Sequence, residues 1–243
     1  MEIFQITTGI ITILFVLINF ILGIKIASTY RNRKNINYLY VGIAWLGIAF
    51  PLIPDILQFF FSFFSPEISD FSLIVLYALF NIIIIPIVVL LWLTALTNLL
   101  HLKNRTKKII LLVYGIFAII MEILIVSFIF IEINMIGKIG DYPYQVVWSP
   151  LSDIVLISSL SIVLITGFLF ARELLRSMDK EVKLRGQFLL LAFITFVVGN
   201  IVEILFTTPE SNIIARSILI LSSIEFYIGL TMPNFAKRFF FKD

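Results

Sequence analysis

Six ionisable side chains lie inside stretches of this chain that are otherwise almost entirely apolar. They are five carboxylates and one guanidinium: Asp55, Glu122, Asp153, Glu203, Glu225 and Arg216. A charged group in apolar surroundings loses its hydration, so it is kept where it has a partner of opposite charge or a function. The chemistry open to such residues is ligand binding, ion binding or proton transfer.

Arg216 and Glu203 are the two of these residues that the sequence places side by side. Each lies roughly one helical turn from the end of its apolar stretch, and a tight turn near Pro209 joins the two stretches. The residues therefore lie level on adjacent antiparallel helices. A buried Arg needs a carboxylate partner, and Glu203 is the predicted one. The pair is either a structural lock between two helices or the centre of a ligand or ion site.

Further polar residues lie at a similar depth on other apolar stretches. Asn200 precedes Glu203 by three residues and so shares its helix face. The predicted ligand-binding residues are Asp55, Asn81, Asp153, Asn200, Glu203 and Arg216. Together they predict a polar pocket open to one side of a helix bundle. The alternative is a set of separate interhelical hydrogen bonds, which hold membrane helices together.

Glu122 and Glu225 lie deeper in their stretches than the predicted pocket. Glu122 shares a helix face with Gly115 and Ala118, which predicts a closely packed interface around a protonated carboxyl group. Glu225 lies about half a helical turn around from Arg216, so the two are not expected to pair. If the protein is a transporter, Glu122 and Glu225 are the candidates for a proton path.

The elements that must position these residues are seven apolar helices. The chain has 243 residues, of which 60% are hydrophobic and 14% charged, and its mean hydropathy is +1.09. A helix needs about 20 apolar residues to cross the hydrocarbon layer. The expected helices are residues 3–29, 36–64, 71–101, 109–134, 148–175, 187–207 and 211–232. The prediction is an all-α, seven-transmembrane bundle over 1–233 with a short basic, aromatic tail over 234–243.

The basic residues fix the expected orientation of this bundle. Sixteen of the eighteen Lys and Arg residues follow the first, third and fifth stretches or lie in the tail, which leaves Lys138 and Arg216. Cytoplasmic loops of membrane proteins carry the Lys and Arg excess. We therefore expect the N-terminus outside, the C-terminus in the cytoplasm, and a multi-pass protein of the plasma membrane. The net charge of +3 belongs to this lipid-facing pattern and does not indicate nucleic-acid binding.

The sequence contains no motif that indicates an enzyme, a metal site or a cofactor. It has no cysteine and one histidine, and we find no Ser/Lys dyad and no Asp-rich motif. The first apolar stretch has no basic segment before it and no small-residue cleavage site, so we expect a retained helix. We expect no enzyme activity, no cofactor and no metal.

The topology is also that of rhodopsins and of G-protein-coupled receptors, but the marker residues of those families are absent. The last helix, 211–232, has no lysine for a Schiff base, so we expect no covalent retinal. The third helix ends Asn98-Leu-Leu-His-Leu-Lys, without the Asp-Arg-Tyr of the receptors. Prolines at positions 51, 54 and 86 predict kinks in the second and third helices.

Two stretches carry a different resemblance. They are Lys183-Leu-Arg-Gly-Gln-Phe-Leu-Leu-Leu with Gly199-Asn200, and Gly229-Leu-Thr-Met-Pro before the basic tail. On these the chain resembles the seven-transmembrane sensor module of microbial histidine kinases, as a stand-alone protein. The resemblance implies a receptor-like sensor that binds a small molecule and signals through a separate cytoplasmic partner or a homodimer. The alternative is a small-solute or proton-coupled transporter, in which the same polar residues line a path.

Overall fold

The structure is a computed structural model that describes residues 3–64, 68–100, 102–140, 145–206 and 208–241. Lys242, the last basic residue of the predicted tail, lies outside these ranges. Within them, seven helical spans are long and apolar enough to cross a membrane. The spans are α1 (Ile3–Arg33), α2 with α3 (Asn37–Ile48 and Ile53–Phe64), α4 with α5 (Asp70–Ala78 and Ile84–Leu99), α6 (Asn104–Ile131), α7 (Pro150–Leu175), α8 (Lys180–Leu205) and α9 (Pro209–Thr231). This agrees with the predicted seven-helix bundle.

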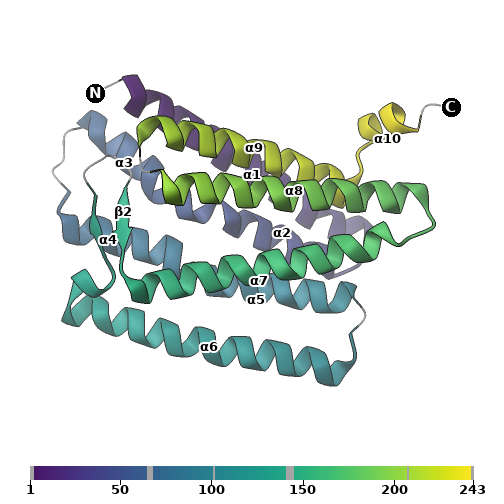
Figure 1. The fold of residues 1–243 in the computed structure, drawn as a ribbon, viewed down its shortest axis with the longest axis horizontal. Coiled ribbons are helices and arrows are strands. Elements are labelled where there is room, and N and C mark those ends of the chain that lie inside the picture. The colour runs from purple at the N-terminus through teal and green to yellow at the C-terminus, as the bar shows by residue number, and fades with distance from the viewer. Residues whose placement is uncertain (1–2, 65–67, 101, 141–144, 207, 242–243) are drawn as a thin grey trace.

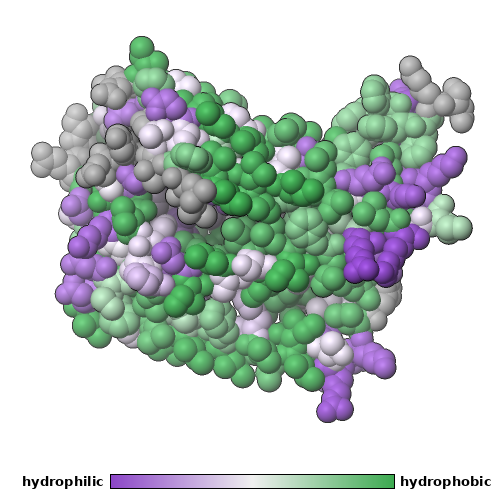
Figure 2. Space-filling view, in the orientation of Figure 1, coloured by the Kyte–Doolittle hydropathy of each residue, from purple (hydrophilic) through white to green (hydrophobic). Residues whose placement is uncertain are grey.

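The helices run side by side along the long axis of the molecule. The chain begins at one end of the bundle, and α10 (Asn234–Phe240) lies at the other (Figure 1). The basic links after α1, α5 and α7 all fall at the α10 end. Hydrophobic side chains cover the middle of the visible face, and hydrophilic ones gather at both ends (Figure 2). The protein is therefore a multi-pass membrane protein with an apolar belt for lipid.

Small residues bring neighbouring helices into close contact. Gly42 of α2 lies against the backbone of α1, where a Cβ added to it would be 2.5 Å from the Ala27 nitrogen. Between α8 and α9, Gly199 lies against the side chain of Leu219, where an added Cβ would be 2.8 Å from Leu219 Cδ2. Small residues at membrane-helix interfaces allow this approach and the dispersion contacts that follow from it. In contrast, a Cβ added to Gly115 of α6 would meet no atom within 4 Å beyond the backbone of its own helix, so the close helix approach expected at this glycine is not found there.

The predicted kinks in the second and third helices occur as local changes of helix type. Pro51 lies in a 3₁₀ turn, Phe50–Leu52, that separates α2 from α3. A π-helical turn, Leu79–Ile83, separates α4 from α5 just before Pro86. A proline cannot donate the helical hydrogen bond to the residue four positions earlier. Each break therefore lies near a proline that removes a hydrogen-bond donor. The sequence predicted kinks at the prolines, but it did not predict that one of them would take the form of a π-helical turn.

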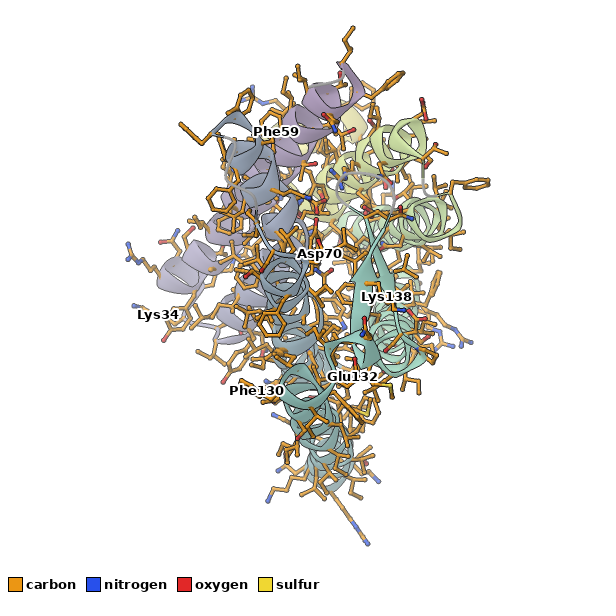
Figure 3. The ribbon with its side chains drawn as sticks, turned by 90° about the vertical axis from the view of Figure 1, so that its left-hand side faces the viewer. Lys34, Phe59, Asp70, Phe130, Glu132 and Lys138 are labelled. Carbon is orange, nitrogen blue, oxygen red and sulfur yellow. The ribbon has the colours of Figure 1, made fainter. Side chains whose placement is uncertain are left out.

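A small β-hairpin forms at the end of the bundle opposite α10. Strand β1 (Gly137–Ile139) pairs antiparallel with β2 (Val146–Trp148). The hairpin is fastened to α7, because the Ser152 hydroxyl donates to the Ile136 carbonyl at 2.7 Å. Figure 3 shows it across the helix ends, with Lys138 on its strand. The predicted helices leave residues 135–147 as a connecting loop, and part of this loop forms the hairpin. The described part of the chain is all-α apart from these two strands.

The sixth span begins seven residues earlier than the predicted start at 187. Asp179 caps α8: its carboxylate accepts hydrogen bonds from the backbone N–H groups of Glu181, at 2.7 Å, and Val182, at 3.3 Å. Acidic side chains stabilise a helix at this position because they satisfy free N–H groups. The charged segment 172–185, which the sequence allowed as an extension of the fifth helix or as a segment on the membrane surface, is divided between two helices: α7 ends at Leu175 and α8 begins at Lys180.

Candidate functional site

Arg216 lies at the centre of a polar cluster buried between five helices. Its side chain, on α9, is 1% exposed. One guanidinium nitrogen, Nη2, bonds to Oδ2 of Asp55 on α3. The other, Nη1, donates to the Oγ1 of Thr12 on α1, and that hydroxyl donates in turn to the Thr8 carbonyl at 2.7 Å. A charge taken out of water requires this kind of compensation, so Asp55 and Arg216 stabilise each other.

Asp55 receives a second donor from α4. The Tyr77 hydroxyl lies 2.5 Å from Asp55 Oδ1 and 3.2 Å from Gln58 Oε1. A hydroxyl has one proton, and the nearer, charged oxygen takes it. Both oxygens of the buried carboxylate are therefore hydrogen-bonded.

The two helix breaks hold Tyr77 and Asp55 in position. Asn81 lies in the π-helical turn, and its amide nitrogen donates to the Pro51 carbonyl at 3.1 Å and to the Tyr77 carbonyl at 3.2 Å. This side chain joins the break in the second span to the break in the third. The predicted site residue Asn81 thus supports the cluster through backbone groups. The proline kinks bring α3 and α4 together at the level of Arg216.

Glu203 faces Arg216 as the sequence predicted, but it is not the closest partner. Its Oε1 lies 3.7 Å from Arg216 Nε, which is an ion pair and too long for a hydrogen bond. Arg216 Nε has no hydrogen-bond partner among the described residues. The sequence predicted Glu203 as the counter-ion of Arg216. In the structure Asp55 is the counter-ion, because it bonds directly to the guanidinium. The Glu203 side chain is 28% exposed and forms the open edge of the cluster.

Two of the predicted pocket residues lie apart from this contact network. The Asn200 amide donates to the Phe196 carbonyl of its own helix at 2.7 Å. Asp153 lies half-buried in the first turn of α7, where a negative charge complements the helix dipole. Its carboxylate has no polar partner within the part of the chain that the structure describes. The structure joins Asp55, Glu203 and Arg216 and leaves Asn200 and Asp153 outside their contacts.

Helix α1 contributes polar residues that are not among the predicted site residues. Thr12 and Asn19 are fully buried on this helix. Asn19 accepts a hydrogen bond from the Ser223 hydroxyl of α9 at 3.0 Å, further from the hairpin end than Arg216. Polar residues at positions 8, 12 and 19 follow a helical period in an apolar stretch, and this pattern could have identified them.

Glu225 and Glu122 lie in separate parts of the bundle. Thr195 of α8 donates to Glu225 Oε2 at 2.5 Å, which supplies the partner that the sequence left unknown. Glu122 of α6 lines a narrow apolar crevice with Pro86 and Met121. No described contact joins the two carboxyl groups into one path. Among the described residues, no three of His, Asp and Glu lie close enough together to hold a metal ion.

Tyr77→Phe is expected to lower the free energy of unfolding by about 1–3 kcal/mol, because Asp55 stays buried and loses a donor. The free energy is measured by denaturant titration in detergent micelles. The matched control is Tyr40→Phe, because Tyr40 is half-buried and its hydroxyl has no partner among the described residues. Equal losses in the two variants would show that the bond to Asp55 adds nothing.

The cluster has an excess of negative charge in its formal balance. Asp55 and Arg216 neutralise each other, and Glu203 adds a second carboxylate beside the same guanidinium. A positively charged group placed at Glu203 would complete the balance.

No protein-family model matches the sequence, and comparison with curated proteins gives no significant match.

Proposed function

We propose that the protein is a microbial receptor-like sensor of the cell membrane. A small molecule binds from outside at the edge of the Arg216 cluster, and the signal passes to a separate cytoplasmic partner or to a second copy of the chain. The observation that carries this proposal is the position of Glu203. It is a partly exposed carboxylate beside a buried, already neutralised ion pair. The charge balance favours a ligand with a positively charged group.

The orientation follows from the basic residues. The links after α1, α5 and α7 and the α10 segment carry the Lys and Arg excess at one end of the bundle. By the positive-inside rule this end faces the cytoplasm. The β-hairpin and Glu203 then face the outside, where a solute reaches them without crossing the membrane.

Helices α8 and α9 connect the site to the cytoplasmic end. α8 carries Glu203 near one end and Glu181 at the other, and α9 carries Arg216 and leads into α10. Glu181 forms an ion pair with Lys237 of α10, with 2.8 Å between Oε2 and Nζ. A ligand that binds one spacing of α8 and α9 more tightly shifts the population of that spacing. The basic segments at the inner end then change position together, which is the signal.

Transport is the second candidate, and one observation favours it. Buried polar groups continue inward from Arg216 along α1, α8 and α9, at Asn19 with Ser223 and at Thr195 with Glu225. Polar groups at this depth also line solute and proton paths. A transporter requires that the outer groups become accessible from the cytoplasm in part of the cycle.

Cysteine labelling separates the two functions, because the native chain has no cysteine. We expect Asn81→Cys and Asn200→Cys to react with a membrane-impermeant maleimide in right-side-out vesicles and not in inside-out vesicles. Both side chains are half-buried near the cluster. Phe206→Cys and Met178→Cys, at exposed positions at opposite ends, are the controls for outer and inner access.

Reaction of Asn81→Cys or Asn200→Cys from both sides would contradict a one-sided receptor and support transport. Protection of both positions from both sides would show that the polar residues are packed between helices. The outward pocket would then be rejected. Equal labelling of both controls in both vesicle types would mean that the vesicles are not sealed, and the preparation would be repeated.

A further inference from the structure

A shallow, open surface depression of about 450 Å³, called the cleft below, lies at the α10 end of the bundle, far from the Arg216 cluster. Its lining residues come from the start of α8 and from α10: Asp179, Lys180, Glu181, Lys237, Arg238 and Phe241. Three of them are basic and two acidic. Figure 2 shows hydrophilic side chains gathered at this end beside the apolar ones of α10.

The two acidic residues of the cleft are already engaged. The Asp179 carboxylate caps α8 through the backbone N–H groups of Glu181 and Val182. Glu181 bonds to Lys237 at 2.8 Å and to Arg185 at 2.7 Å. The Asp179 carboxylate is thus bonded to the start of a helix, and the Glu181 carboxylate is bonded to two cations.

Two cations of the cleft remain without a counter-ion. Lys180 and Arg238 are exposed, and neither forms an ion pair with any residue in the described ranges. The two cations give the cleft an uncompensated positive charge, which favours an anionic group such as a phosphate.

Aromatic side chains next to the cleft indicate where that phosphate comes from. Phe235 is 63% and Phe239 73% exposed on α10, one turn apart on the same face. Phe240, on the other side, packs edge-to-face on Phe188 of α8 with ring centroids 5.4 Å apart, and this contact fixes α10 to the bundle. Exposed phenylalanines beside lysine and arginine at the end of membrane-spanning helices are typical of an interfacial segment. A soluble phosphate compound would not need them.

We propose that this cleft binds the headgroup of an anionic phospholipid, with Lys180 and Arg238 on the phosphate and Phe235 and Phe239 among the acyl chains. The site is independent of the sensor function. It holds α10 at the membrane surface, because the lipid contacts residues from both α8 and α10.

Native mass spectrometry of the full chain in detergent tests the site, with dioleoyl phosphatidylglycerol and dioleoyl phosphatidylcholine as probes. We expect phosphatidylglycerol to bind more tightly to the wild type. Lys180→Gln/Arg238→Gln should weaken its binding about thirtyfold, since each cation near an anionic lipid contributes about a factor of five. Arg105→Gln/Lys108→Gln removes two exposed bases at the same end but outside the cleft, and should leave this affinity within about twofold.

The charge-conserving variant Lys180→Arg/Arg238→Lys should retain most of the binding, which separates loss of charge from loss of folding. Equal affinity of the wild type for the two lipids would overturn the proposal. An equal loss in the Arg105 and Lys108 variant would overturn it as well, because the attraction would then belong to the whole basic face. Displacement of phosphatidylglycerol by millimolar glycerol 3-phosphate would show a site for soluble phosphates instead.

Discussion

Arg216→Met is expected to lower the free energy of unfolding by about 3–5 kcal/mol, the usual cost of leaving a buried carboxylate without its counter-ion. The stranded carboxylate is Asp55, which is 4% exposed in its side chain and bonded directly to Arg216. Titration of mixed micelles with sodium dodecyl sulfate, followed by circular dichroism, measures this free energy. The double variant Asp55→Asn/Arg216→Met should recover part of the loss, because it removes both charges together.

Glu203→Gln provides the comparison for Arg216→Met. Its carboxylate is partly exposed and 3.7 Å from the guanidinium, so the expected loss is below about 1 kcal/mol. If Glu203→Gln cost as much as Arg216→Met, Glu203 would be the main counter-ion of Arg216, and our assignment of Asp55 would be wrong. The assignment would also fail if Arg216→Met were as stable as the wild type.

Gly42→Leu is expected to destabilise the bundle by about 1–3 kcal/mol or more, the usual cost of overpacking. A Cβ at this position would lie 2.5 Å from the backbone nitrogen of Ala27 and 2.6 Å from its Cβ. A backbone atom cannot turn aside as a flexible side chain does, so α1 and α2 must separate. The thermal unfolding midpoint in detergent measures the effect.

Gly115→Leu is the matched control for this prediction. It introduces the same side chain into the interior of a helix, at a position where an added Cβ would meet no atom within 4 Å beyond the backbone of its own helix. Leucine has a higher helix propensity than glycine, so we expect no loss and a gain of up to about 1 kcal/mol. Similar losses at positions 42 and 115 would mean that the close approach of α1 and α2 is not what limits stability.

The architecture could be predicted because the length of a membrane span and the position of its basic ends are properties of the sequence itself. Seven apolar stretches of sufficient length became seven helical spans. The exception is the start of α8, because the charged segment 172–185 was also compatible with an extension of the fifth helix or with a segment on the membrane surface. Charged residues are expected at loops and equally at helix ends outside the hydrocarbon, and only the Asp179 cap distinguishes the two.

The site could be predicted only in part. The sequence indicates how deep in the membrane a residue lies, but it does not show which helices are neighbours in the bundle. Glu203 and Arg216 could be placed together, since a short turn makes their helices neighbours. Asp55 could be placed at the right depth, but nothing in its spacing shows which side of the bundle α3 occupies. Thr12 lies 204 residues before Arg216, and a pairing over that distance follows only from the packing order of the helices.

The separation of Asp55 from Arg216 along the chain has a consequence for biosynthesis. The two residues are 161 positions apart, and Asp55 enters the bilayer with the second span while Arg216 enters with the last. At a synthesis rate of about 5–20 residues per second, Arg216 is synthesised about 8–30 s after Asp55. During that interval the nascent chain carries an uncompensated polar group within the lipid. The insertion machinery, or a proton on the carboxylate, must shield it until the last hairpin arrives.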